Sequence, residues 1–338
     1  MNFIKKNAAG ILLTAALGVI SVIISEYIPY HLISAGVFAM IIGMILNPVV
    51  SKGNYFNYGI GFVSKKVLKF AIILMGLRLS FSQVFQVGKY SLIVMVFTLL
   101  CAFGGGYLLG KIFKMNWKLS GLISAGTGIC GGSAIAAIAP TIDAEDRDVA
   151  YAISATFIFD IVMVILFPIM GKAFGMTDFG YGLWAGTAVN DTSSVVAAGY
   201  AFSDVAGNFS VIVKLTRTLS IIPAVLIFSF INERLNAKQN KEKGKHKKVD
   251  LKKIFPYFIL MFLGMVAVRS LNIIPVSITE NIADISKFLM IMALGAIGLK
   301  TNFKEVSKSG FRPMLHGFII SALVVVVSFV VQMFLGQV

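Results

Sequence analysis

Two short polar runs interrupt apolar segments of this sequence, and their residue types could bind a small ion or solute. They read Gly126-Thr-Gly-Ile-Cys-Gly-Gly-Ser-Ala-Ile-Ala-Ala137 and Gly186-Thr-Ala-Val-Asn-Asp-Thr-Ser-Ser-Val-Val-Ala197. A shift of sixty residues aligns them, so that Gly126 matches Gly186. Polar breaks inside a spanning segment are tolerated only where they line protein or a water-filled cavity, and a related pair indicates a transporter's binding site.

Unwound backbone at the two runs would offer amide N–H groups and carbonyl oxygens to a ligand, and the hydroxyl side chains would add neutral donors. A helix that starts after the break turns its positive end toward an anion. We therefore predict a substrate site from these residues of the two runs: Thr127, Cys130, Gly131, Ser133, Asn190, Asp191, Thr192 and Ser193. The alternative is close helix packing through small residues.

Lys214 and Arg217 lie in another apolar segment, three residues apart, and so share one face of a helix. A charge inside a membrane span is costly and by default functional. We predict that both side chains belong to the substrate site and attract an anion. They could instead be counter-ions of Asp191, or extend to the membrane interface.

Asp160 is flanked by apolar residues on both sides. A buried carboxylate either pairs with a cation or takes up a proton. We predict that Asp160 or Asp191 carries the coupling ion. A structural pair of Asp160 with Lys214 or Arg217 is the alternative.

The composition indicates an integral membrane protein, because 57% of the 338 residues are hydrophobic and only 13% are charged, against about 25% charged in soluble domains. Two cysteines and three histidines form no ligand pattern, so we expect no metal site. The absence of P-loop, His-Glu-x-x-His and nucleophile-elbow motifs predicts no enzyme activity and no cofactor. Transport would then be secondary, driven by an ion or substrate gradient.

Apolar stretches of suitable length predict an all-α polytopic membrane protein of about eleven transmembrane helices. The expected spans are 8–28, 32–47, 65–83, 90–110, 119–140, 148–171, 180–202, 208–231, 254–273, 284–300 and 313–336.

Lys and Arg gather in alternate loops, which places the N-terminus in the cytoplasm and the C-terminus outside. The net charge of +15 thus reflects topology rather than nucleic-acid binding. We expect one transmembrane domain over residues 1–338, in two halves joined by a basic cytoplasmic linker at about 233–253.

A second internal sequence match predicts an inverted repeat. Met75-Gly-Leu-Arg-Leu-Ser-Phe81 matches Ile297-Gly-Leu-Lys-Thr-Asn-Phe303 at an offset of seven spans, and an odd offset makes the two segments antiparallel, as an inverted repeat requires. The spans 119–140 and 180–202, however, count as parallel. A miscounted span near Phe167-Pro168, convergence of the two motifs, or re-entrant half-helices would each account for this.

The two polar runs, together with Val213-Lys-Leu-Thr-Arg217, resemble the YeiH family of bacterial inner-membrane proteins, to which sulfate export is ascribed. The resemblance covers nearly the whole chain. It implies a multi-spanning protein of the plasma membrane, similar in design to the bile-acid-symporter-like class with inverted repeats and crossed, broken helices. It also implies an anionic substrate.

These observations predict a secondary transporter, an exporter, of a small anion such as sulfate or an organic sulfonate or carboxylate, bound near the membrane midplane. H⁺ and Na⁺ are both open as coupling ions, and so is a homo-oligomer in the lipid bilayer. One alternative is a Na⁺-coupled carrier or channel that uses Asp160 and Asp191. Another is a membrane protein that transports nothing, such as an assembly factor or an intramembrane enzyme.

Overall fold

The computed structural model describes residues 3–27, 35–51, 55–238, 257–271, 273–301 and 310–337, and these residues form helices without any strand. The helices before the first polar run are α1 (Phe3–Tyr27), α2 (Ala35–Val50), α3 (Asn57–Phe62), α4 (Leu68–Met75) and α5 (Phe81–Ile112). The two runs and their neighbours form α6 (Trp117–Ala125), α7 (Gly132–Ile138), α8 (Asp146–Ala173), α9 (Asp178–Ala188), α10 (Thr192–Phe202), α11 (Asp204–Thr218) and α12 (Ile221–Lys238). The last helices are α14 (Tyr257–Ser270), α15 (Val276–Lys300) and α17 (Phe311–Phe334).

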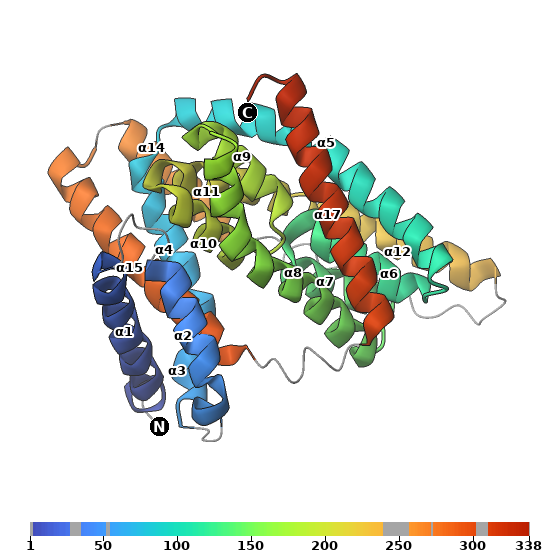
Figure 1. Ribbon diagram of the computed structural model, residues 1–338, viewed down its shortest axis with the longest axis horizontal. Coiled ribbons are helices and arrows are strands. Elements are labelled where there is room, and N and C mark those ends of the chain that lie inside the picture. Colours follow the sequence, from blue (N-terminus) through green and yellow to red (C-terminus); the bar gives the residue numbers. More distant parts are fainter. Residues whose placement is uncertain are drawn as a thin grey trace.

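The helices pack as two groups that lie side by side (Figure 1). The first group contains α1 to α4 with α14 and α15, which is far away in sequence. Asn47 of α2 donates to the carbonyl of Leu299 at 2.7 Å, and Ser286 of α15 donates to the carbonyl of Ala71 at 2.7 Å. The second group contains α5 to α12 and α17, so each group includes a helix from late in the chain that packs against much earlier ones.

Six helices of the described residues are long and apolar enough to cross a membrane. They are Asn7–Ser25, Phe81–Ile112, Arg147–Ala173, Asp204–Leu235, Ile278–Lys300 and Phe311–Phe334. The span Asp204–Leu235 joins α11 and α12 through a turn at residues 219–220. They confirm a polytopic, all-helical membrane protein, but they do not reach the expected count of about eleven.

The other five expected spans are short or interrupted. As described, α2 has 16 residues and α14 has 14. The expected span 65–83 begins within a π-helical turn, Val63–Val67, and contains a 3-10 turn, Gly76–Arg78. The spans 119–140 and 180–202 are each divided into two short helices. The polar runs indicated the interruptions of the last two spans, whereas the π-helical and 3-10 turns of the span 65–83 occur in a segment that apolar periodicity counts as continuous.

Glycines bring backbones into direct contact in both groups. A Cβ atom on Gly298 of α15 would lie 2.1 Å from the carbonyl oxygen of Met40 in α2. A Cβ atom on Gly186 of α9 would lie 2.7 Å from the carbonyl oxygen of Ser210 in α11. Association of helices in lipid depends on such close packing, because burial of apolar surface gains little there.

Three predictions of the sequence are not decided by this fold. The basic linker at about 233–253 lies largely outside the described residues, since α12 ends at Lys238 and α14 begins at Tyr257. The single domain over residues 1–338 and the inverted repeat stay predictions.

Replacement of Gly298 by alanine should lower the thermal unfolding temperature of the detergent-purified protein, because the backbone of α2 blocks the added methyl group. Overpacking costs about 1–3 kcal/mol. The matched control is Gly104→Ala in α5, where a Cβ atom meets nothing within 4 Å and alanine favours the helix. Equal unfolding temperatures for the two variants would contradict the contact.

Candidate functional site

The first polar run breaks its helix at Gly131. After α6, the residues Gly126–Cys130 form a π-helical turn, and α7 begins at Gly132. Between them Gly131 has φ +63° and ψ −135°, a conformation that side chains with a Cβ atom disfavour. The glycine is therefore the residue that permits the break.

The second polar run breaks its helix over Val189–Asp191, where Val189 and Asp191 are extended. Asp191 is the N-cap of α10, and its carboxylate accepts the amide of Ser193 at 2.9 Å. Gly131 and Asp191 are sixty residues apart, so the breaks occupy equivalent positions in the two runs. A Cβ atom on Gly131 would lie 3.1 Å from the Cβ of Asp191, which shows that the breaks touch.

Arg217 of α11 is fully buried and holds the ends of both interrupted helices. Its Nε donates to the carbonyl of Gly128 at 2.6 Å, and its two terminal nitrogens donate to the carbonyls of Thr127 and Thr187. These carbonyls lie where α6 and α9 end, which is the negative end of each helix dipole. The guanidinium thus pairs oxygen atoms that the breaks leave without amide partners.

Lys214 is also fully buried and makes the same kind of contact one turn earlier on α11. Its ammonium group donates to the carbonyls of Ile129 at 2.9 Å and Val189 at 3.1 Å, one from each break. The structure therefore gives both cations partners that the sequence did not predict, namely backbone oxygens.

Asp160 of α8 is also fully buried, but it binds backbone amide groups rather than carbonyl oxygens. Its two carboxylate oxygens accept the backbone amides of Asn190 at 2.8 Å and Asp191 at 2.7 Å. The carboxylate thus lies at the positive end of α10. None of the contacts among the described residues is a direct ion pair between Asp160 and Lys214 or Arg217.

The two helix breaks, at residues 126–131 and 189–191, meet in the crossing that Arg217, Lys214 and Asp160 hold together. The remaining predicted residues lie either inside this crossing or at its rim. Thr127 and Asn190 are fully buried, and both approach Ser321 of α17. The hydroxyl oxygens of Thr127 and Ser321 are 3.5 Å apart, and the side-chain amide of Asn190 donates to the Ser321 hydroxyl at 3.3 Å. Cys130 is buried, whereas Ser133 is exposed and donates to the Cys130 carbonyl at 2.9 Å. Asp191 and Thr192 are partly exposed and Ser193 is buried. The structure thus brings the predicted residues together, and their part in binding stays a prediction.

Sequence reasoning missed the contribution of α17. One face of this helix carries three polar side chains that are completely buried: Ser321, Ser328 and Gln332. Ser328 contacts the hydroxyl of Thr187 at the second polar run. The signal was available, because these three residues recur on one face of an otherwise apolar span.

Membrane-length helices, two broken helices in contact and buried charges at the contact define a polytopic α-helical membrane protein. Residues 9–317 match the family described as conserved hypothetical protein 698. The chain belongs to this family, also called UPF0324 or YeiH, which confirms the resemblance seen in the sequence.

Relatives over the full length carry the name UPF0324 membrane protein. The protein of Clostridium tetani is 73% identical over 345 residues, which covers 100% of both chains. The protein of Streptococcus pneumoniae serotype 4 is 40% identical over 344 residues and 99% of both chains. That of Fusobacterium nucleatum is 38% identical over 327 residues, 91% of this chain and 92% of the relative.

Replacement of Asp160 by asparagine should destabilise the protein by about 1–3 kcal/mol, because the amide nitrogen of asparagine leaves one of the two backbone N–H groups without an acceptor. Thermal unfolding in detergent measures the loss. Glu145→Gln is the control, since that carboxylate is exposed. An Asp160→Asn variant as stable as this control would show that the carboxylate does not hold the second break.

Arg217→Lys should also destabilise the protein strongly, although the charge is kept, because an ammonium group does not reproduce the fork that reaches four carbonyls, those of Thr127, Gly128, Thr187 and Val189. The control is Arg147→Lys at an exposed arginine. Equal unfolding temperatures for these two variants would refute the role assigned to the guanidinium.

Proposed function

We propose that this protein is a secondary transporter, an exporter, that carries a small anion across the bacterial plasma membrane, with its N-terminus in the cytoplasm and its C-terminus outside. Sulfate and small organic sulfonates or carboxylates are the substrate class. The observation that carries the proposal is the contact of two helix breaks around buried charges. Irregular backbone and charged groups at membrane depth are costly, and a substrate or ion path is their usual reason.

The substrate would approach the rim of the crossing, where Ser133 is exposed and Asp191 and Thr192 are partly exposed. Lys214 and Arg217 would attract the anion from behind the breaks rather than touch it, because their nitrogens already donate to carbonyls. Their field reaches the rim because charges interact strongly in a medium of low dielectric constant.

Charge balance supports H⁺ as the coupling ion. The crossing contains two cations, Lys214 and Arg217, and two carboxylates, Asp160 and Asp191, so its net charge is zero when all four are ionised. Uptake of one proton on a carboxylate leaves a net positive charge, which favours binding of an anion. The anion and the proton would then cross the membrane in the same direction, so export would be driven by the outward gradient of the anion itself. Asp191 is the better placed of the two, because it is partly exposed whereas Asp160 is fully buried.

One observation favours a second candidate, a Na⁺-coupled carrier or channel. The side-chain oxygen Oδ1 of Asn190 is buried without a hydrogen-bond partner, and such an oxygen could bind a cation together with Asp160 or Asp191. Lys214 and Arg217 both donate to the carbonyl of Val189, the residue before Asn190, and their charge opposes Na⁺ binding there, which is the reason to prefer H⁺.

The test is transport by purified protein in proteoliposomes, with sulfate, methanesulfonate and acetate as probes under an imposed H⁺ or Na⁺ gradient. We expect one of these anions to move with the H⁺ gradient, and Asp191→Asn to remove the dependence on pH. Glu145→Gln is the control and should behave as wild type. The transported anion should also stabilise the protein by about 2.7 kcal/mol at 100 times its dissociation constant.

Two results would count against this proposal. Anion movement that requires Na⁺ and ignores pH would favour the second candidate. Failure of all three anions to move under either gradient would reject anion transport itself.

A further inference from the structure

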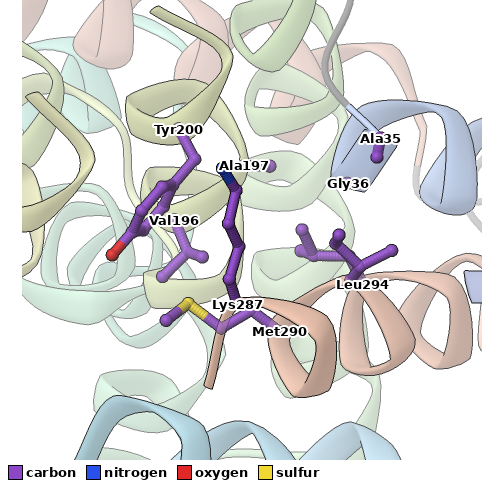
Figure 2. Close-up of a pocket in the computed structure, with 9 residues that line it drawn as sticks. Ala35, Gly36, Val196, Ala197, Tyr200, Lys287, Met290 and Leu294 are labelled. Carbon is purple, nitrogen blue, oxygen red and sulfur yellow. The ribbon is translucent and has the colours of Figure 1, made fainter. Parts of the chain in front are cut away.

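A cavity of about 50 Å³ lies between the two helix groups, large enough for a few water molecules or one small polyatomic ion. Its walls come from the start of α2, from α10 and from α15 (Figure 2). The polar side chains that line it are Tyr200 and Lys287, and the other lining residues are apolar or small. A few polar groups in an apolar wall are also the lining of small-molecule sites, and the volume limits a ligand here to a small ion.

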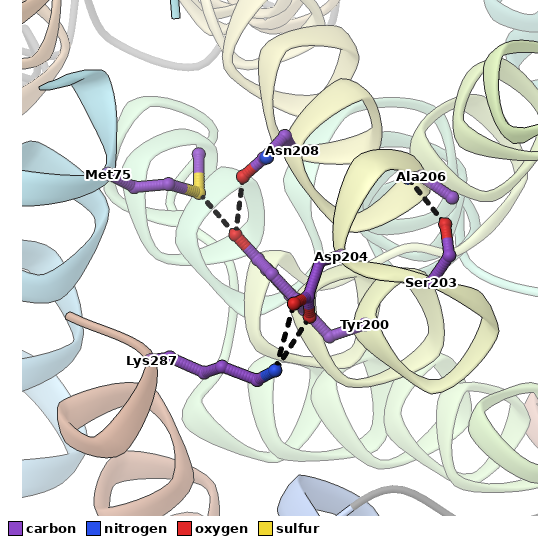
Figure 3. A network of polar contacts seen from close by, with 7 residues as sticks. All are labelled: Met75, Tyr200, Ser203, Asp204, Ala206, Asn208 and Lys287. Carbon is purple, nitrogen blue, oxygen red and sulfur yellow. Dashed lines mark hydrogen bonds and ion pairs between the residues drawn. The ribbon is translucent and has the colours of Figure 1, made fainter. Parts of the chain in front are cut away.

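Lys287 extends from α15 toward α10 in this cavity (Figure 2). It lies within the candidate membrane span Ile278–Lys300, where a positive charge is costly. Its ammonium group pairs with Asp204 at the start of α11, at 2.8 Å from Oδ1 and 3.0 Å from Oδ2 (Figure 3). The pair joins α15 of the first group to α11 of the second.

This lysine differs from Lys214 and Arg217 in what it could do. Those two cations are fully buried on backbone carbonyls, and an anion that displaced them would leave those oxygens unpaired. The side chains of Lys287 and Asp204 are each 46% exposed. Because both side chains of this pair are partly exposed, an incoming anion can reach Lys287 and take the place of Asp204 without leaving a fully buried group unpaired.

The cavity is also connected with the broken-helix crossing through α10. Val196, Ala197 and Tyr200 line the cavity, and the same helix begins at Thr192, directly after the second break. Tyr200 lies about 12 Å along the helix axis from that start. Its hydroxyl lies 2.8 Å from Oδ1 of Asn208 and 2.8 Å from the sulfur of Met75 in α4 (Figure 3), which is a further contact between the two helix groups.

We propose that this cavity is an entry site for the transported anion, and that Lys287 exchanges the carboxylate of Asp204 for the anion. The ion pair closes the gap between the helix groups when no anion is bound. Binding of the anion releases Asp204 and with it one of the contacts that hold α11 to α15. This inference rests on the proposed anion transport and names the residues that admit the substrate.

The experiment is the proteoliposome assay with the anion that wild type carries among sulfate, methanesulfonate and acetate, measured as a half-saturation concentration. Lys287→Gln should raise this concentration about tenfold or more, since it removes a charge-assisted hydrogen bond. Lys287→Arg should stay near wild type. Asp204→Asn should lower the concentration, because it removes the competing carboxylate. The control is Arg147→Gln, which breaks an exposed ion pair that is not part of the cavity lining.

The outcomes separate the two proposals. Transport by wild type with unchanged half-saturation in Lys287→Gln and Asp204→Asn would overturn the entry site and leave anion transport standing. If Lys287→Gln fails to fold, Asp204→Asn decides alone, and a raised or unchanged half-saturation concentration rejects the exchange. Failure of wild type to move any of the three anions rejects the proposed function, and the entry site falls with it.

Discussion

The pairing of interrupted backbone with three buried charges is the interaction on which the rest of this structure depends. Each break leaves carbonyl oxygens at the end of one helix and amide groups at the start of the next. Unpaired groups of this kind cost several kcal/mol each inside a membrane. Arg217 and Lys214 bind the oxygens of both breaks, and Asp160 binds amides of the second. The breaks, α8 and α11 must therefore lie together.

That requirement explains the close packing around the crossing. A guanidinium that reaches Thr127 and Thr187 from one helix needs the two interrupted helices within one side-chain length of α11. Gly186 allows this approach, because its missing side chain lets α9 touch the backbone of α11. The buried polar face of α17 then covers the side of the crossing where Thr127 and Asn190 point.

Two sets of charged side chains thus have different physical roles. Lys214, Arg217 and Asp160 are fully buried and bind backbone groups of the two breaks. Lys287 and Asp204 are partly exposed, bind one another and join two helix groups that pack mainly through apolar contacts. The proposed transport would use both: a site that keeps its geometry, and a partly exposed contact that a substrate can replace. The exposure of each charge, rather than its presence in the sequence, distinguishes the two roles.

Much of the architecture follows from the sequence because it depends on local composition. Apolar length determined the six long helices, and the polar runs marked both breaks, since glycine at 131 and an N-cap aspartate at 191 act within one turn. The six long helices do not reach the expected count of about eleven spans, because length and composition do not show whether a short or interrupted apolar segment crosses a membrane.

The tertiary structure alone decided what the charged side chains touch. From the sequence, Lys214 and Arg217 could equally be anion ligands or counter-ions of a carboxylate, since both readings need only a cation in an apolar segment. The fold places carbonyl oxygens of two segments, sixty residues apart in the chain, within reach of the same two nitrogen-bearing side chains. Neither hydropathy nor spacing encodes that meeting, because it arises from the packing of helices that are distant in sequence. The same holds for Lys287 and Asp204, which are 83 residues apart and become partners only when the two helix groups meet.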